Sequence, residues 1–279
     1  MEEKSIIIEE HPNMPAMQNG VVAQLDNINQ GTVAIEASRA IAEAQGKLII
    51  AKRFPRDEVS AYAKAMEACQ RPTMAEKAFY SFPRGGQTVE GPTIRFAEEL
   101  ARCWGNIDYG IKELSQDDGK SEMQAYAWDL ETNAQSVQNF TNPHQREQGK
   151  KMVTLTSQRD IYENNANMAT RRLRSRILAI LPSWFVEDCI EECKKTLSGK
   201  NDTPLVDRVK KMIVSFAKLG VTQEQIETRL KRKVDTMNAD DFVEYIGIYN
   251  AIKQGESKIA EWFEAEKVAS DLTDALKGE

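Results

Sequence analysis

The stretch from Ser157 to Leu181 constrains the fold of this chain most, because it has the pattern of one long helix. Unbroken, it would be roughly 35 Å long at 1.5 Å per residue. Ser157 is a suitable N-cap, Asp160 stands in the first turn, and Pro182 marks the expected end. Apolar side chains recur at steps of three and four, the spacing of one buried helical face. The predicted buried residues are Tyr162, Ala166, Ala169, Leu173, Ile177 and Ile180.

The opposite side of this predicted helix carries amide and guanidinium groups. From Asn164 to Leu181 there are four arginines and no acidic residue. An ordinary solvated amphipathic helix can show the same pattern, so the pattern alone leaves two interpretations open, a solvated face or a surface for an anionic polymer. At 100° per residue the residues that fall together are Asn164, Asn167, Arg171 and Arg174, with Asn165 and Arg172 on one flank and Arg176 nearer the buried edge.

The charge distribution favours the second interpretation. The whole chain has 279 residues and a net charge of −6, which argues against a wholly basic nucleic-acid binder. Residues 142–180, however, contain eight lysines and arginines against three acids, and every other long block is net negative. A local basic stripe on an acidic protein is typical of a site for an anionic polymer.

Composition sets further bounds. With 41% hydrophobic residues the chain can form a sizeable core. No run approaches the ~18 apolar residues of a membrane span. The N-terminus MEEKSIII lacks the basic and apolar regions of a secretion signal, so a cytoplasmic location is expected.

Cysteine and histidine usage gives no metal-site pattern. The four cysteines, Cys69, Cys103, Cys189 and Cys193, form no CxxC pair. Only His11 and His144 could complete a zinc site, and nothing in the sequence ties either to the cysteines. Buried, reduced thiols are therefore expected, with no metal and no cofactor.

The order of elements predicts an α+β fold: an antiparallel β-meander packed with helices, including the long basic helix, followed by a small all-helical C-terminal module. Helices are expected at 33–50, 57–70, 93–101, 157–181 and 185–197, and strands at 78–89 (as a hairpin), 107–114, 122–130 and 136–140. Helices at 206–219, 223–230, 240–253 and 257–276 follow a linker at 198–202. The predicted organisation is a flexible segment 1–30, a core 31–200 and a module 204–279.

Two candidate contact sites for a nucleic acid emerge. The long helix presents arginines, whose planar donors suit phosphate oxygens, and Lys150, Lys151 and Arg159 extend this stripe. The predicted hairpin places Tyr80 and Phe82 on one face beside Arg84. Aromatic rings beside a cation can stack bases of a single strand, although the same rings can also be core residues of the sheet.

A catalytic alternative comes from the acids of the meander. Clustered carboxylates could serve a metal-dependent nuclease, but these acids alternate with turn residues and fit solvated loops and strand faces better. The glycines of the PRGG turn have neither P-loop nor dinucleotide-binding spacing. The acids concerned are Asp117, Asp118, Glu122, Asp129 and Glu131.

Two segments carry a resemblance to a known family: ACQRPTMAEKAFYSFPRGGQTVEGPTIRFAEEL and, after the meander, NMATRRLRSRILAIL. Their order resembles that of the phage single-strand annealing proteins of the RecT/Redβ superfamily, with Erf-type and Rad-type annealing proteins as more distant relatives. The similarity covers about residues 50–190, and Tyr80-Ser81-Phe82-Pro83 is its most specific part.

The resemblance implies a protein without enzymatic activity or cofactor. Such a protein binds single-stranded DNA and anneals complementary strands without ATP in phage homologous recombination, inside the bacterial host cell. It implies a ring or helical filament of identical subunits, and a C-terminal module, 204–279, that meets a phage exonuclease or the host single-strand-binding protein. Alternatives are a metal-dependent nuclease or a protein-interaction adaptor. The candidate DNA-binding residues are Arg159, Arg171, Arg172, Arg174, Lys150, Lys151, Arg84, Tyr80, Asn164 and Asn167.

Overall fold

The structure is a computed structural model that describes residues 30–85, 87–148, 151–199 and 203–264. The chain divides into two compact units, Met1–Ile49 and Ile50–Glu279. The predicted flexible segment 1–30 falls almost wholly outside the described residues. The predicted boundary near 200–204 falls inside the second unit, and the separate C-terminal module stays a prediction.

The first unit is described from residue 30 onward, where it forms most of helix α1 (Gln30–Arg53). Its apolar side chains are exposed, including Val33, Ile35 and Ile41. Arg39 pairs with Glu36 and Glu43 one turn away on either side, an arrangement that supports an exposed helix.

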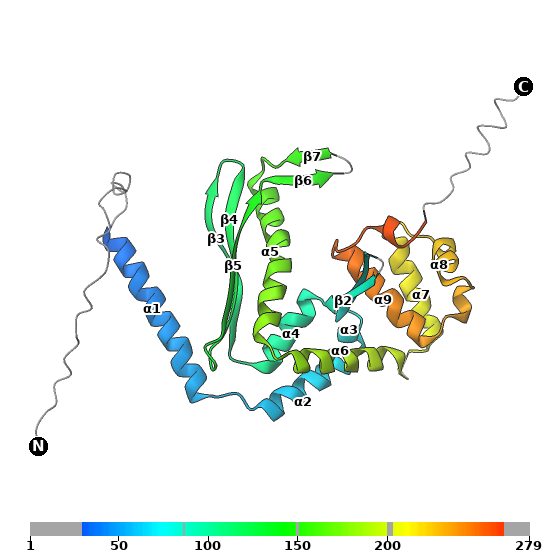
Figure 1. The fold of residues 1–279 in the computed structure, drawn as a ribbon, viewed down its shortest axis with the longest axis horizontal. Coiled ribbons are helices and arrows are strands. Elements are labelled where there is room, and N and C mark those ends of the chain that lie inside the picture. Colours follow the sequence, from blue (N-terminus) through cyan, green and yellow to red (C-terminus); the bar gives the residue numbers. More distant parts are fainter. Residues whose placement is uncertain (1–29, 86, 149–150, 200–202, 265–279) are drawn as a thin grey trace, which may run out of the picture. The chain divides into compact units, whose positions relative to one another are not determined.

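The second unit is built on a three-stranded antiparallel sheet that confirms the predicted meander. Helix α5 lies along one face of this sheet (Figure 1). Strand β4 alternates strictly, and the small side chains of Ala125 and Ala127 on its inner face let the helix approach closely. The elements are β3 (Ile107–Asp117), β4 (Lys120–Asp129), β5 (Gln135–Pro143) and α5 (Gln158–Ile180).

The buried face of α5 differs from the predicted one by one position. Tyr162 is 69% exposed, whereas Ile161 and Asn165 are buried. The helix therefore packs through positions four residues apart. The predicted face is wrong at its N-terminal end, where Tyr162 and Ala166 were expected to be buried. The physical reason is that Asn165 finds hydrogen-bond partners in the sheet, so a polar residue can occupy the buried row. The buried row is Ile161, Asn165, Ala169, Leu173 and Ile177.

A layer of helices lies beyond the C-terminal end of α5 (Figure 1). Its core contains Phe96, Leu100, Trp104 and Phe185, all nearly inaccessible to solvent. Asp57 and Thr93 cap two of these helices by accepting hydrogen bonds from main-chain amides of the first turn. The helices are α2 (Glu58–Cys69), α3 (Pro72–Ala75), α4 (Ile94–Trp104) and α6 (Ser183–Ser198).

The predicted hairpin around PRGG is present and packs against a C-terminal helix. Asn250 of that helix, α9, donates to the carbonyl oxygens of Glu76 and Phe79, both at 2.8 Å. The hairpin consists of β1 (Phe79–Arg84) and β2 (Gln87–Pro92). The helices that follow α6 are α7 (Leu205–Ala217), α8 (Gln223–Leu230) and α9 (Ala239–Lys253), with 3-10 turns η1 (Val234–Thr236) and η2 (Ile259–Glu261).

The predicted fourth helix of this region, 257–276, is wrong over its described part. Only the short turn η2 forms there, and the rest lies outside the described residues. Consecutive Trp262 and Phe263 are both buried, and Trp262 donates its indole N–H to Ser257 at 2.9 Å. Two adjacent side chains buried together do not suit one face of a helix.

A second hairpin extends from the end of the sheet. Its strands are β6 (Gln145–Gln148) and β7 (Lys151–Thr154), and all the side chains described on them are exposed.

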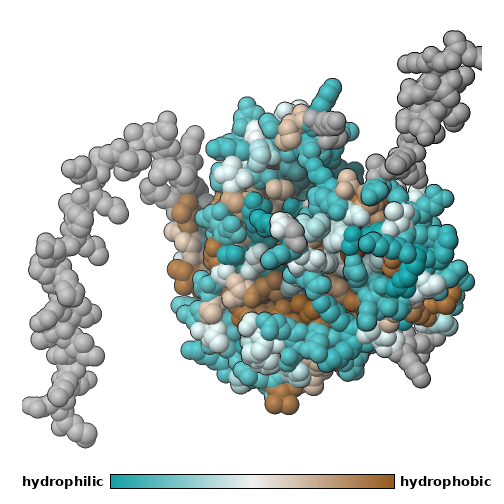
Figure 2. Space-filling view, turned by 45° about the vertical axis from the view of Figure 1, so that its right-hand side comes forward, coloured by the Kyte–Doolittle hydropathy of each residue, from teal (hydrophilic) through white to brown (hydrophobic). Residues whose placement is uncertain are grey.

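Hydrophilic residues cover most of the face of the molecule shown in Figure 2, and hydrophobic residues gather near its centre.

Candidate nucleic-acid interface

The basic face of α5 is occupied by acceptors from the same chain. Arg174 Nη1 lies 2.9 Å from Glu256 Oε1, and Arg171 Nε lies 3.6 Å from the same oxygen. Arg171 also donates to the carbonyl oxygens of Gln254, at 3.2 Å, and of Gly255. These carbonyls lie just past the end of α9, whose dipole places partial negative charge there. The two arginines thus form a preassembled anion site, which residues 254–258, called here the strap, fill.

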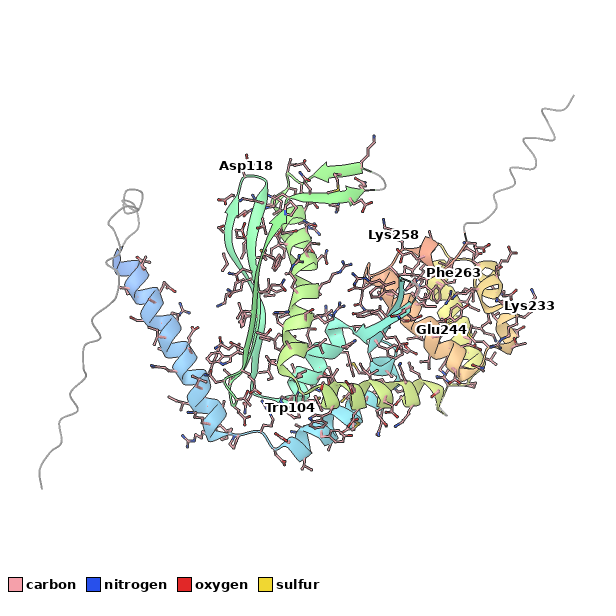
Figure 3. All side chains as sticks on the ribbon, in the orientation of Figure 1. Trp104, Asp118, Lys233, Glu244, Lys258 and Phe263 are labelled. Carbon is pink, nitrogen blue, oxygen red and sulfur yellow. The ribbon has the colours of Figure 1, made fainter. Side chains whose placement is uncertain are left out.

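The strap also reaches the hairpin β6–β7. Lys258 Nζ lies 3.8 Å from Glu147 Oε1 of β6, and both side chains are well exposed. Figure 3 labels Lys258 at the edge of the C-terminal helices that faces this hairpin. The strap therefore bonds to both elements that carry the predicted basic stripe, α5 and the hairpin.

Tyr80 is a core residue and not an accessible stacking platform, which corrects one of the predicted contacts. It is 9% exposed, its ring stacks on Phe82 with centroids 5.8 Å apart, and Arg174 lies 4.6 Å above it. Burial raises the pKa of Tyr80 even though Arg174 opposes this. The residue opposite Tyr80 in the hairpin is Gly91. A glycine suits this position, because a Cβ there would stand 2.6 Å from the phenol oxygen. Tyr80 therefore positions Arg174.

Arg172 faces the sheet instead of the arginine pair. Its guanidinium lies 4.1 Å from the ring centre of Phe140 on β5, and Nη1 donates to the carbonyl of Met168 at 2.8 Å. This position beside the sheet agrees with the prediction that Arg172 lies on the flank of the helix. Its cation–π contact leaves it half-buried, so it is a less accessible donor than Arg171.

The N-terminal half of α5 holds further predicted residues. Asn164 donates to the carbonyls of Pro143 and Gln145, at 3.3 and 3.5 Å, and so fastens the start of the hairpin. Asn167 and Arg159 are exposed and have no side-chain partner within the described part of the chain. Lys151 on β7 is likewise exposed. Arg159, Asn167 and Lys151 are thus free to contact a ligand.

Two predicted residues remain. Arg84 is exposed at the end of β1. Lys150 lies outside the described residues.

A buried polar network beneath α5 was missed by sequence reasoning. Asn142 donates to Asn165 at 2.7 Å, and Asn165 donates to Ser121 at 2.9 Å and to Glu113 at 3.1 Å. Ser121 lies 2.8 Å from the ring nitrogen Nε2 of His144. The network joins all three strands to the helix at the root of the hairpin β6–β7, so it fixes the direction in which the hairpin leaves. The available signal was that Asn165 is four residues from both Ile161 and Ala169.

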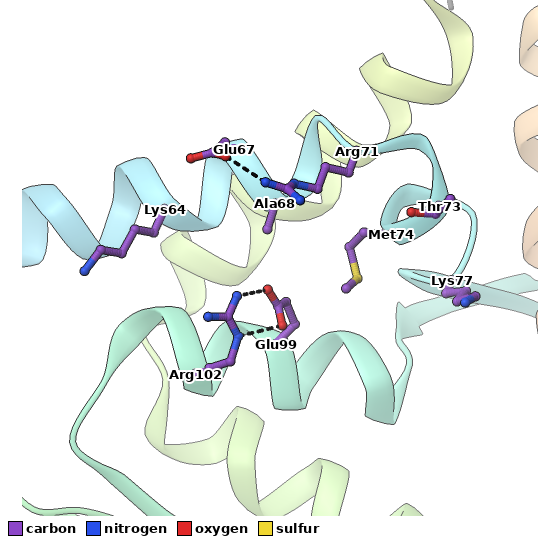
Figure 4. Close-up of a pocket in the computed structure, with 9 residues that line it drawn as sticks. All are labelled: Lys64, Glu67, Ala68, Arg71, Thr73, Met74, Lys77, Glu99 and Arg102. Carbon is purple, nitrogen blue, oxygen red and sulfur yellow. Dashed lines mark hydrogen bonds and ion pairs between the residues drawn. The ribbon is translucent and has the colours of Figure 1, made fainter. Parts of the chain in front are cut away.

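A pocket with a volume of about 470 Å³ lies between α2, α3 and α4 (Figure 4). Two of the four basic residues that line it already have carboxylate partners. Arg71 pairs with Glu67 at 2.8 Å, and Arg102 Nε donates to Glu99 at 2.9 Å. The two arginines of this pocket are therefore compensated, and among the described residues its two lysines, Lys64 and Lys77, have no carboxylate within 4.0 Å.

The five acids of the meander do not converge. Asp129 and Glu131 are engaged by Arg56, whose guanidinium lies 2.9 Å from Asp129 Oδ1 and 3.7 Å from Glu131. Burial alone would raise the pKa of Asp129, but its hydrogen bonds with Arg56 and the Glu131 amide hold it below the usual value. Among the described residues, no three His, Cys, Asp or Glu are grouped so that they could hold a metal ion.

The four cysteines are buried and unpaired. Burial, with help from the nearby Glu99 carboxylate, raises the pKa of Cys103 to about 11. A hydrogen bond with Cys69 and burial both raise the pKa of Cys189 and Cys193. The same hydrogen bonds lower the pKa of Cys69. Cys103, Cys189 and Cys193 are therefore protonated at neutral pH, and all four side chains belong to the core.

Comparison with known proteins adds no relative. No family model, no curated protein and no solved structure matches the chain. Over the described residues, no helix combines the length and the apolar character that crossing a membrane requires.

Proposed function

We propose that the chain binds single-stranded DNA along α5 and the hairpin β6–β7, and anneals complementary strands without ATP during phage recombination in the host cytoplasm. The observation that supports this most is the arrangement of Arg171 and Arg174, which together hold a carboxylate and two carbonyl oxygens. Phosphate diester oxygens are acceptors of the same kind. The exposed Arg159, Asn167 and Lys151 continue this surface toward the hairpin.

In this proposal a phosphate replaces Glu256. The exchange leaves both arginines paired, so neither guanidinium loses its partner when the strap is displaced. Contacts of this type go to the DNA backbone and leave base edges free, which is what pairing with a second strand requires. Annealing breaks no covalent bond, so the function needs no catalytic residue. A homo-oligomeric ring or filament would extend the basic surface from one subunit to the next.

The remaining partners follow from the resemblance to the annealing proteins alone. In that reading residues 204–279 meet a phage exonuclease or the host single-strand-binding protein. A nuclease function has no comparable support, because the best-placed acids, Asp129 and Glu131, are engaged by Arg56.

Binding of a fluorescent oligonucleotide tests the proposal. The variant Lys151→Ala/Arg159→Ala removes two exposed cations that have no partner among the described residues, so the fold should be unaffected. We expect weaker binding and a salt dependence reduced by about 0.7 in log–log slope for each lost contact. The matched control is Lys218→Ala, an exposed lysine at the end of α7. Equal affinity and slope in the double variant and the wild type would contradict the proposed surface.

A further inference from the structure

A second pocket lies at the seam between α3, α7 and α9, and has a volume of about 400 Å³. Ligand pockets for small molecules are typically about 300–1,000 Å³. This seam pocket is separate from the arginine pair of α5, and its properties do not depend on DNA binding there.

Its walls carry an excess of positive charge. Four cationic side chains line it against one carboxylate, that of Glu76. Within the described part of the chain, no carboxylate lies within 4.0 Å of any of the four. In the pocket of Figure 4, by contrast, both arginines have glutamate partners. The four cations of the seam pocket are Lys77, Arg208, Lys211 and Lys253.

Arg208 is the most constrained of these cations. It is 8% exposed, its Nη1 donates to the Leu197 carbonyl at 2.7 Å, and its guanidinium lies 4.9 Å from the ring centre of Phe242. Its Nε is buried and has no acceptor among the residues that the structure describes. Burial lowers the pKa of Arg208, which shows that its charge is only partly compensated by its surroundings. A bound anion would supply that compensation.

The rest of the pocket is apolar and aromatic. Met212, Phe242 and Ile246 are buried and form its floor, and the partly exposed ring of Tyr249 forms one side. Lys253 Nζ stands 5.6 Å from the centre of the Tyr249 ring. An aromatic surface next to ammonium groups suits a ligand that combines a flat ring with a phosphate.

We propose that the seam pocket binds a nucleotide phosphate, with the phosphate among Lys77, Arg208, Lys211 and Lys253 and the base against Tyr249. The nucleotide can be free or can be one unit of a DNA strand, because both present the same group. The pocket has no P-loop spacing around it, so the site is for binding and implies no hydrolysis.

Calorimetric titration of the full chain with thymidine 5′-monophosphate at low salt tests this. The wild type should bind it saturably, and Lys211→Glu/Lys253→Glu should bind at least about tenfold more weakly, as expected when charge-assisted contacts are replaced by repulsion. The control is Lys210→Glu, which reverses a neighbouring exposed charge of α7 that does not line the pocket and should bind nearly as the wild type does. If the double charge reversal fails to fold, Lys211→Gln/Lys253→Gln gives the same comparison with a smaller perturbation.

Competition separates the two sources of the ligand. Displacement of the mononucleotide by oligothymidylate assigns the site to a strand, and lack of displacement assigns it to a free nucleotide. The proposal is overturned if thymidine 5′-monophosphate does not bind the wild type, or if the double variant binds it equally well. The proposal would also be overturned if the seam pocket bound an aspartate-rich peptide and no nucleotide.

Discussion

Arg174 and Glu256 are 82 residues apart in sequence, yet their side chains meet at 2.9 Å and each is 12% exposed. The carboxylate occupies the position at which the proposed function requires a DNA phosphate. If DNA binds there as proposed, the strap competes with it, and single substitutions should separate the strap-bound state from the DNA-bound state.

Neutralising Glu256 should strengthen DNA binding. Glu256→Gln keeps the shape and one acceptor oxygen but removes the charge that competes with phosphate. We expect affinity for a single-stranded oligonucleotide to rise by about tenfold, equivalent to about 1.4 kcal/mol, as measured by fluorescence anisotropy at low salt. Glu261→Gln, an exposed position with no ion pair among the described residues, should leave affinity unchanged. Unchanged or weaker binding by a folded Glu256→Gln protein would show that the strap does not compete.

Removing the buried amide of α5 should destabilise the fold. Asn165→Ala removes the acceptor of the Asn142 amide and one of the two partners of Ser121 beneath the helix, so the free energy of unfolding in urea should fall by about 2–4 kcal/mol. Asn167→Ala, two residues away on the exposed face, should change it by less than about 0.5 kcal/mol. Similar values for the two variants would mean that the network contributes little.

The pair of Arg56 and Asp129 should give the protein a specific acid sensitivity. The folded-state pKa of Asp129 is below its unfolded value. The ionised carboxylate therefore stabilises the folded protein fully above about pH 4. This stabilisation is lost as the pH falls through the folded pKa. Asp129→Asn leaves the buried Arg56 with only the longer contact to Glu131, at 3.7 Å, as a charge partner and should cost about 3 kcal/mol of stability at neutral pH. Urea unfolding between pH 6 and pH 3 should show that the difference in the free energy of unfolding between wild type and variant becomes smaller as the pH falls. A constant difference would contradict the assignment of the acid sensitivity to Asp129.

The contact of Tyr80 with Gly91 predicts a steric effect at the hairpin. A Cβ at position 91 would stand 2.6 Å from the Tyr80 oxygen, so Gly91→Ala must move the ring away from Arg174. We expect a loss of about 1–3 kcal/mol of stability, as for other overpacked sites. Gly91→Ala/Tyr80→Phe removes the closest of the clashing atoms, the Tyr80 hydroxyl, and should recover part of that loss. Failure to recover any would show that the hydroxyl does not cause it.

Periodicity was sufficient to predict the α+β class, the meander, the long helix and the PRGG hairpin. It erred where a polar residue replaced an apolar one in the buried row, because the partners of Asn165 come from strands 23 to 52 residues away. The strap could not be predicted for a similar reason. Nothing local to residues 254–258 indicates that they meet arginines more than 80 residues earlier. Tyr80 had two interpretations in the sequence, and only its burial distinguishes them.

The most direct test of the proposed function is the rate at which the full chain pairs complementary oligonucleotides, measured by energy transfer between labelled strands without ATP. The wild type should accelerate pairing over the spontaneous rate, Lys151→Ala/Arg159→Ala should reduce the acceleration, and Glu256→Gln should retain it at higher salt. The absence of acceleration by wild-type protein at low salt, where its binding to the strands is saturated, would contradict the annealing function.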